Sequence, residues 1–242
     1  MLRPPTIPGL LITGTDTGIG KTVIAGAIAA WFNQRGQRVG VVKPAASGCV
    51  KRREGLVSED AEFLAHCADA RQPLDVIAPQ RFLEPLAPAV AAQRLGVALD
   101  WTAIQRSLDV TARESDVLIV EGVGGIMVPM DEQHTKLDVA AWLKLPAVVV
   151  ARPALGTINH TILTVDALRS RNVPVAGVVI NRYPAENANV AEETNPRAIE
   201  KWGKVPVLCI VPDVREPIER RIPADIAAAV GMVDWTRFAA AR

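Results

Sequence analysis

The feature that most constrains the fold is a short apolar run that leads into a glycine-bearing turn and a Gly-Lys-Thr triplet. The apolar run covers residues 10–13, the turn covers 14–20, and Lys21 and Thr22 open an alanine-rich helical pattern. A strand, a tight turn and a helix in this order form a phosphate-binding loop, because backbone N–H groups and the helix N-terminus face the anion. Lys21 would add a positive charge, and Thr22 a hydroxyl for Mg²⁺.

The glycine spacing of this loop departs from the general pattern. Five residues separate Gly14 from Gly20, where the general pattern has four, so Thr15 stands in the place of the first glycine. The alternative interpretation is a glycine-rich turn that only begins a helix. A Gly-Lys-Thr triplet directly after an apolar strand favours the phosphate loop.

Composition indicates a globular α/β protein. The 242 residues are 49% hydrophobic but only 4% aromatic, which suits parallel strands covered by helices on both faces. A net charge of +1 gives no reason to expect nucleic acid or an anionic membrane as a partner. Three cysteines without metal-ligand spacing indicate reduced thiols, and no apolar run reaches membrane-spanning length. We therefore expect a cytoplasmic protein without a signal peptide or a membrane anchor.

Strand and helix patterns alternate along the chain after an expected flexible lead-in over residues 1–9. Six strand patterns cover 10–13, 38–42, 116–121, 147–151, 175–180 and 205–211. Helical patterns follow Lys21 and Ser58, cover 100–113, 137–143 and 158–171, and recur weakly at 234–241. Residues 49–57 are expected to form a charged loop. The alternation predicts one domain over 1–242, with a doubly wound, mostly parallel sheet and helices on both faces.

Two acidic residues stand where a metal beside phosphates would need them. Glu121 ends an apolar strand just before the glycine run 122–125, and a carboxylate there can join Thr22 as a Mg²⁺ ligand. The alternative is a solvated glutamate at a strand end. Asp60, at a helix start, is the second candidate ligand, although the helix dipole alone also favours an acid there.

Polar residues also follow strands at the edge where open α/β sheets bind ligands. Lys43 precedes a Ser-Gly turn at this edge, a position that favours a lysine facing the phosphates, although an ordinary surface lysine is the alternative. Asn181 ends another strand, and its amide can read the edge of a base. Gly156 and Thr157 precede a long helix whose free N–H groups could bind a carboxylate, although Thr157 could equally be an ordinary cap.

Five motifs together resemble the dethiobiotin synthetase family in order and spacing. They are the phosphate loop 14–22 and the segments 43–48, 84–88, 120–125 and 155–160. The resemblance covers roughly residues 8–215, and the five-residue glycine gap is normal for this family. It implies a homodimeric enzyme with a sheet of about seven strands. It also implies a reaction of ATP, Mg²⁺ and CO₂ with 7,8-diaminononanoate (7,8-diaminopelargonate) that yields dethiobiotin, ADP and phosphate in biotin biosynthesis.

The resemblance also assigns roles to residues of this chain. Nucleotide phosphate contacts fall to Thr17, Gly18, Ile19, Gly20, Lys21, Thr22 and Val23. The Mg²⁺ ligands are Thr22, Asp60 and Glu121, and Glu121 also lies against the nucleotide. Lys43 and Ser47 hold the substrate carbamate, and the catalytic set is Lys43, Lys21 and Thr17. The adenine is held by Asn181 and the stretch near Pro212. The partner subunit receives the distal carboxylate of the substrate on Gly156, Thr157 and Asn159.

The implied chemistry fits these residue types. A diamine takes up CO₂ as a carbamate, and a carbamate oxygen attacks the γ-phosphoryl group to give a carbamic–phosphoric anhydride. The second amine then attacks the carbonyl carbon, and phosphate leaves. Such a reaction needs positioning and charge neutralisation by Lys21, Lys43 and Mg²⁺ more than it needs a nucleophilic serine or cysteine.

Three other classes compete with this interpretation. A partition-type ATPase shares the fold, but carries an additional lysine in the phosphate loop where this chain has Asp16. A cobyrinate-type amidotransferase ligase needs a further glutaminase domain, for which we expect no room in 242 residues. A GTPase reads its base with an Asn-Lys-x-Asp motif, whereas Asn181 is followed by Arg182.

Overall fold

A six-stranded parallel sheet forms the centre of the computed structural model, which describes residues 1–53, 55–214 and 221–239. The strand order is β10-β9-β8-β1-β7-β2, and each neighbouring pair is parallel. The strands are β1 (Gly9–Gly14), β2 (Val39–Val42), β7 (Val117–Glu121), β8 (Ala147–Ala151), β9 (Val175–Tyr183) and β10 (Val207–Pro212). The predicted fold class is confirmed, but the sheet has six strands within the described residues, not about seven.

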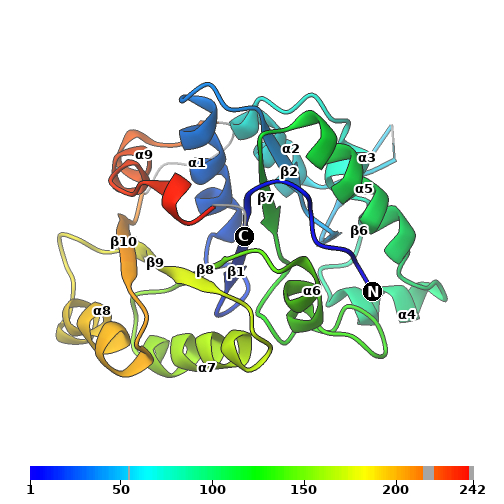
Figure 1. Cartoon of the computed structure of the whole chain (residues 1–242). Coiled ribbons are helices and arrows are strands. Elements are labelled where there is room, and N and C mark those ends of the chain that lie inside the picture. The colour runs from blue at the N-terminus through cyan, green and yellow to red at the C-terminus, as the bar shows by residue number, and fades with distance from the viewer. Residues whose placement is uncertain (54, 215–220, 240–242) are drawn as a thin grey trace.

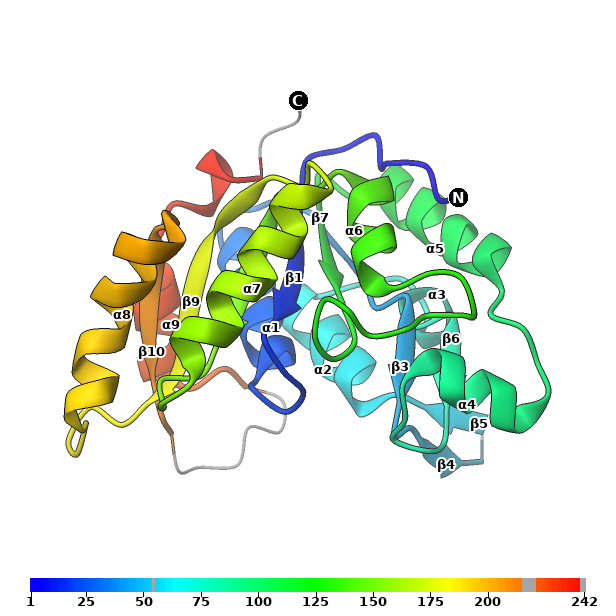
Figure 2. The same cartoon turned by 90° about the horizontal axis from the view of Figure 1, so that it is seen from below.

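Helices cover both faces of this sheet (Figures 1 and 2). They are α1 (Lys21–Asn33), α2 (Glu59–Ala68), α3 (Leu74–Ile77), α4 (Pro88–Leu95), α5 (Trp101–Glu114), α6 (Lys136–Leu143), α7 (Thr157–Ser170), α8 (Val190–Gly203) and α9 (Ala224–Gly231). Side chains of β1 alternate between two cores: Leu10 and Ile12 pack with α1, α2 and α9, whereas Leu11 packs with α5, α6 and α7. Because successive side chains of a strand point into opposite cores, these strands are apolar along most of their length.

Two small sheets lie beside the C-terminal ends of the central strands. β3 (Ala45–Ser47) pairs with β6 (Gln80–Phe82), and β4 (Val50–Arg52) forms a hairpin with β5 (Gly55–Val57). The expectation of a charged loop over 49–57 is therefore wrong. Its polar side chains still find partners, because Arg52 donates two hydrogen bonds to Glu62 of α2, at 2.6 and 3.0 Å.

The N-terminal segment is packed against the body of the protein. Leu2 is buried in the core beside α5, and the Arg3 guanidinium lies 2.8 Å from an Asp109 carboxylate oxygen. The Pro8 carbonyl accepts a hydrogen bond from the Leu118 N–H at 2.9 Å. The expectation of a flexible lead-in over 1–9 is therefore wrong, since one apolar side chain and strand-like pairing hold the segment in place.

The C-terminal segment also differs from the expectation. The described helix α9 ends at Gly231, and only a 3₁₀ turn over Trp235–Arg237 follows, whereas the sequence predicted a helix over 234–241. Residues 240 and 241 of that prediction lie outside the described residues. Trp235 explains the turn: its side chain is fully buried, and its Nε1 donates to the Val230 carbonyl at 3.0 Å.

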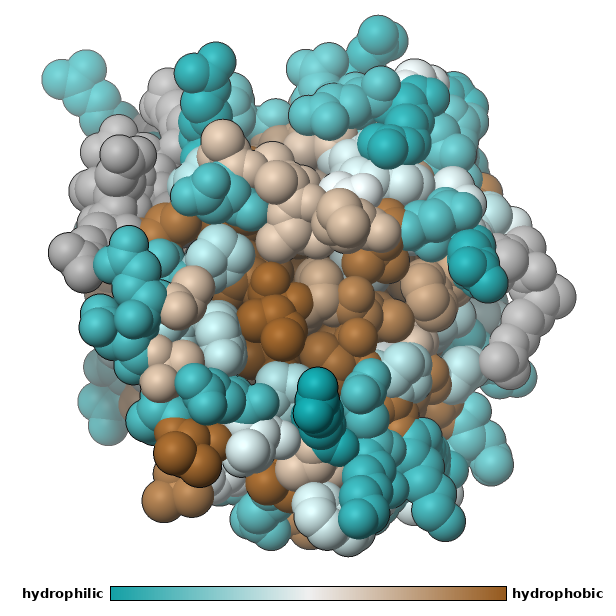
Figure 3. Space-filling model, turned by 90° about the vertical axis from the view of Figure 1, so that its left-hand side faces the viewer, coloured by the Kyte–Doolittle hydropathy of each residue, from teal (hydrophilic) through white to brown (hydrophobic). Residues whose placement is uncertain are grey.

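The sheet edge formed by β10 is the most apolar part of the surface seen in Figure 3. β10 pairs only with β9 among the described strands, and Ile210 is 40% exposed there. No helix in the described part of the chain is both long and apolar enough to cross a membrane.

Candidate functional site

The loop between β1 and α1 is folded around the side chain of Lys21. Its Nζ donates to the Asp16 carbonyl at 2.7 Å, and the Asp16 carboxylate accepts from the Thr17 N–H at 2.7 Å. Asp16 thus holds the loop in shape, a contribution that the sequence could not reveal. Within the described residues, the backbone N–H groups of 18–23 have no hydrogen-bond partner. These donors at a helix N-terminus form a ready site for an anion.

Two glycines allow the loop to adopt this shape. Gly18 and Gly20 have φ values of 73° and 87°, in the left-handed region that favours glycine. A Cβ atom on Gly20 would lie 2.2 Å from Nδ2 of Asn181, which donates to the Ile19 carbonyl at 2.8 Å. Asn181, at the end of β9, is therefore joined directly to the phosphate loop.

Four predicted residues meet in a single cluster beside this loop. Lys43 follows β2, Glu121 ends β7, Thr22 lies in α1 and Asp60 in α2, and parallel strands bring their C-terminal ends to the same edge. The Lys43 ammonium lies 2.6 Å from Asp60 Oδ2 and 2.9 Å from Glu121 Oε1. The Thr22 hydroxyl donates to the same Glu121 oxygen at 2.8 Å. The structure thus brings together the candidate lysine and all three candidate metal ligands.

Burial and charge together set the protonation of this cluster. Burial alone would lower the pKa of Lys43, but the carboxylates of Glu121 and Asp60 outweigh it and raise the pKa. Burial would raise the pKa of Asp60, but the nearby Lys43 ammonium lowers it. The pKa of Lys21 is lowered, chiefly by burial. Lys43 and Asp60 are therefore both charged at neutral pH, and they hold each other in place.

One oxygen of the cluster has no partner. Glu121 is 1% exposed, and its Oε2 accepts no hydrogen bond from the described residues. An orphaned, buried carboxylate oxygen beside Asp60 and Thr22 fits a hard cation, which prefers oxygen ligands. No group of three His, Cys, Asp or Glu residues suited to a metal exists in the described ranges. A Mg²⁺ ion here would thus depend on two carboxylates, one hydroxyl and the oxygens of a bound phosphate.

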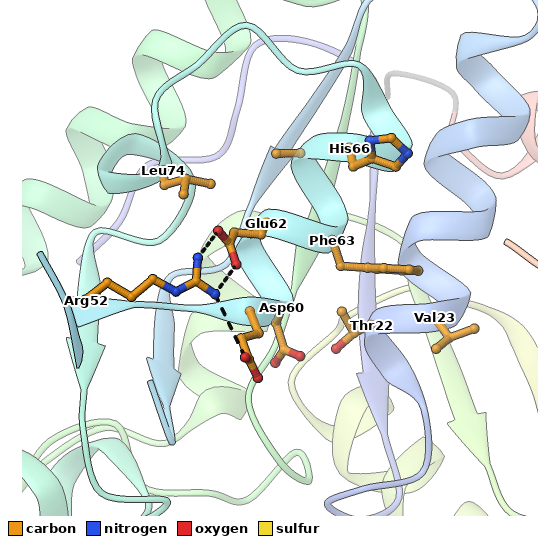
Figure 4. Close-up of a pocket in the computed structure, with 10 residues that line it drawn as sticks. Thr22, Val23, Arg52, Asp60, Glu62, Phe63, His66 and Leu74 are labelled. Atoms are coloured by element: carbon orange, nitrogen blue, oxygen red, sulfur yellow. Dashed lines mark hydrogen bonds and ion pairs between the residues drawn. The ribbon is translucent and has the colours of Figure 1, made fainter. Parts of the chain in front are cut away.

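A pocket of about 640 Å³ opens next to this cluster, between α1 and α2 (Figure 4). Its lining includes Thr22 and Asp60 on one side and the Arg52–Glu62 pair on the other. The hairpin that the sequence did not predict therefore forms a wall of the candidate site.

Two of the five family motifs, the segments 43–48 and 84–88, lie next to each other in the structure. Ser47 ends β3, and the neighbouring Gly48 N–H donates to the Glu84 carbonyl at 3.2 Å. The segments 43–48 and 84–88, far apart in sequence, therefore form one wall near Lys43.

Pro212 and the predicted residues at the start of α7 lie at two other places along the C-terminal edge of the central sheet. Pro212 lines a separate cavity of about 480 Å³ together with Tyr183, Asp213 and Asp225. At the start of α7, Gly156 and Asn159 are accessible, but the Thr157 side chain is buried. The N-cap of this helix is Gly156, so the alternative that Thr157 is the cap is wrong. Residues 215–217, which follow the expected adenine stretch, lie outside the described residues.

The sequence analysis missed Lys136, the first residue of α6. Its side chain is 2% exposed, and its Nζ donates to the Gly124 carbonyl at 2.8 Å. The available signal was a lysine at the start of a short, otherwise apolar helical pattern just after the glycine run.

The strand order and the loop between β1 and α1 place the protein in the P-loop NTPase class. A family model described as an AAA domain matches residues 8–220. The fold is similar to the MinC:MinD cell division protein complex of Aquifex aeolicus, with a TM-score of 0.59, 13% identity and 93% of each chain covered. It is also similar to a ParA family ATPase from Chlorobium tepidum, with a TM-score of 0.52, 16% identity and coverage of 93% and 91%. These identities are low, so the two structures show the fold alone.

Sequence similarity gives the particular family. The chain is 38% identical over 216 residues to the ATP-dependent dethiobiotin synthetase BioD of Thermodesulfovibrio yellowstonii, with 86% of this chain and 90% of the relative covered. It is 37% identical over 234 residues to the protein of the same name from Bacillus velezensis, with coverage of 93% and 98%. The chain belongs to the dethiobiotin synthetase family.

Proposed function

We propose that this protein is an ATP-dependent cyclo-ligase that forms dethiobiotin from 7,8-diaminononanoate, CO₂ and ATP. The observation that carries the proposal is the buried Lys43, held by Asp60 and Glu121 directly beside the phosphate loop. A lysine at this place can neutralise a carbamate and a γ-phosphoryl group at the same time. The N–H groups of residues 18–23, which have no hydrogen-bond partner among the described residues, would receive the phosphates, and this supports the proposed contacts from Gly18 to Val23.

The proposed Mg²⁺ ligands are Thr22, Asp60 and Glu121, and the unpartnered Oε2 of Glu121 supports this set. When bound, the ion would offset negative charge on the β- and γ-phosphates. Lys43 lies between the two carboxylates in this structure. Its ammonium therefore has to leave at least one of them for the site to accept a second cation.

Four residues of this chain have proposed roles in the two steps of the reaction. Lys43 and Ser47 would hold the carbamate, and Lys21 and Thr17 would hold the γ-phosphoryl group for in-line attack by a carbamate oxygen. In the second step the free amine attacks the carbamoyl carbon and loses a proton, and phosphate departs with the former carbamate oxygen. Thr17, Lys21 and Lys43 are thus the proposed catalytic residues.

For the base of ATP, we propose a site between Asn181 and Pro212. Asn181 Nδ2 is already bonded to the Ile19 carbonyl, so its Oδ1 remains to accept a hydrogen bond from the adenine amino group. The cavity at Pro212 has the polar lining that a base edge needs. The bond to Ile19 would also couple base binding to the shape of the phosphate loop.

The distal carboxylate of the diamine is proposed to bind the start of α7 in a partner subunit. Gly156 and Asn159 are accessible there, while Thr157 fixes the helix start through its buried side chain. Leu155, just before the N-cap of α7, and Leu163, within α7, are 82% and 61% exposed, which supports a homodimer that covers them. Residues 1–242 would act as one cytoplasmic domain in this dimer.

Leu163→Glu is expected to shift the protein from dimer to monomer and to raise the KM for the diamine more than tenfold, with a smaller effect on the KM for ATP. A charge at an apolar interface opposes association, because it must be desolvated. Sedimentation velocity and steady-state kinetics measure both effects. Met232→Glu, at an 87% exposed residue after α9, is the matched control. A monomer with full activity would refute the shared site.

Phosphate release with single omissions tests the proposed function. We expect release with diamine, bicarbonate, Mg²⁺ and ATP together, and a loss to near background when any one is left out. DNA or lipid vesicles should have no effect. Stimulation of hydrolysis by either of them, without need for a diamine, would support the partition-type ATPase and contradict the proposal.

A further inference from the structure

The Lys136 side chain is buried, and it forms no ion pair with the residues that the structure describes. It is 2% exposed, and among the described residues its Nζ donates a hydrogen bond to the Gly124 carbonyl alone, at 2.8 Å. A buried ammonium group is costly unless it is well paired. The position at the start of α6 adds to the cost, because the helix N-terminus carries positive partial charge. A methionine would fill the same space at a lower cost, so the bond to Gly124 is what distinguishes a lysine here.

The surroundings of Lys136 connect it with the proposed active site. Burial, together with the charges of Lys21 and Lys43, holds the pKa of Lys136 well below its usual value, against the opposing charge of Glu121. The lysine stem packs on Gly122, where an added Cβ would lie 2.6 Å from Cδ of Lys136. The side chain therefore lies directly under the loop that follows Glu121.

The Gly122–Gly125 loop lies between Lys136 and the phosphate loop. Gly124 has a left-handed φ of 56°, and a Cβ there would come within 3.3 Å of the Thr17 hydroxyl oxygen. The C=O and N–H of a trans peptide point in opposite directions. Because the Gly124 carbonyl is turned toward Lys136, the Gly125 N–H is turned away from it. That N–H has no hydrogen-bond partner within the described ranges.

We propose that Lys136 is a positioning residue that fixes the Gly124–Gly125 peptide, so that the Gly125 N–H donates to the anionic carbamate group of the substrate beside Thr17. This inference rests on the proposed function. Lys136 itself does not touch the substrate. Its hydrogen bond sets the direction of a backbone donor before the substrate arrives, which is the arrangement that stabilises developing negative charge most effectively.

Lys136→Met tests this role. We expect kcat for diamine-dependent phosphate release to fall at least about tenfold, as when one preorganised donor is lost, while the Kd for ATP changes less than twofold. Lys201→Met, on the exposed side of α8, is the control and should leave both unchanged. A kcat within twofold of the wild type would overturn the proposal, and so would a parallel loss of ATP binding.

A measurement on the wild-type protein covers the case in which Lys136→Met does not fold. In ¹⁵N-glycine-labelled protein, the Gly125 amide signal should shift when diamine and bicarbonate are added without ATP. Gly125→Ala identifies this signal by its absence, since a Cβ there meets only ordinary contacts at 3.7 Å or more. An unchanged signal in a protein that catalyses diamine-dependent release would refute the inference alone. Failure of that release would refute the proposed function.

Discussion

Lys43→Met is expected to lower diamine-dependent turnover about 100-fold or more, while the Kd for ATP changes only a few fold. The Lys43 ammonium is buried and is proposed to hold the carbamate, and methionine keeps the length of the stem without the charge. Phosphate release and equilibrium nucleotide binding measure the two effects separately. Lys201→Met again serves as the exposed control. An unchanged rate would remove Lys43 from the mechanism.

The same variant has a second expected result that does not depend on activity. Lys43 lies within 2.9 Å of both Asp60 and Glu121, so it competes with any divalent cation for their oxygens. Without nucleotide, Lys43→Met should bind Mn²⁺, as a stand-in for Mg²⁺, more tightly than the wild type, because the like charge has been removed. Titration followed by electron paramagnetic resonance measures this affinity. Equal or weaker binding would contradict the view that Lys43 occupies the metal site.

Glu121→Gln is expected to reduce turnover about 100-fold and to raise the Mg²⁺ concentration needed for half-maximal rate. The amide keeps the shape of the side chain but removes its charge, and it leaves the buried Lys43 ammonium with Asp60 alone. Rates at increasing Mg²⁺ separate a weakened metal site from a general loss of folding. Glu59→Gln, at the exposed neighbour of Asp60, should retain wild-type kinetics. A wild-type Mg²⁺ dependence in Glu121→Gln would exclude the residue as a ligand.

The sequence predicts those parts of the protein that depend on local chemistry. The phosphate loop and Lys43 each follow an apolar strand and Glu121 ends one, and parallel strands bring such residues to one edge regardless of the details of packing. All six predicted strands are found in the sheet, because each is a short apolar run, as is typical of parallel sheets. The Mg²⁺ and substrate roles of these residues stay proposals, since geometry alone supports them.

The sequence does not predict contacts that depend on distant partners. Leu2 packs into the core beside α5, and the pair of strands β4 and β5 is stabilised by the contact of Arg52 with Glu62 of α2. Trp235 begins a 3₁₀ turn in place of the predicted helix, and its buried indole N–H donates to the Val230 carbonyl. Lys136 was missed because nothing in its own segment indicates that the Gly124 carbonyl lies above it. Each case depends on tertiary packing, which local propensity does not encode.

Transfer of carbon from bicarbonate into the product tests the proposed function most directly. The protein would be incubated with 7,8-diaminononanoate, ATP, Mg²⁺ and ¹³C-labelled bicarbonate, and the products would be analysed by mass spectrometry. We predict dethiobiotin that carries one labelled carbon, in equal amount to the ADP formed. ADP without a labelled cyclic urea would contradict the proposal that this chain closes the ureido ring.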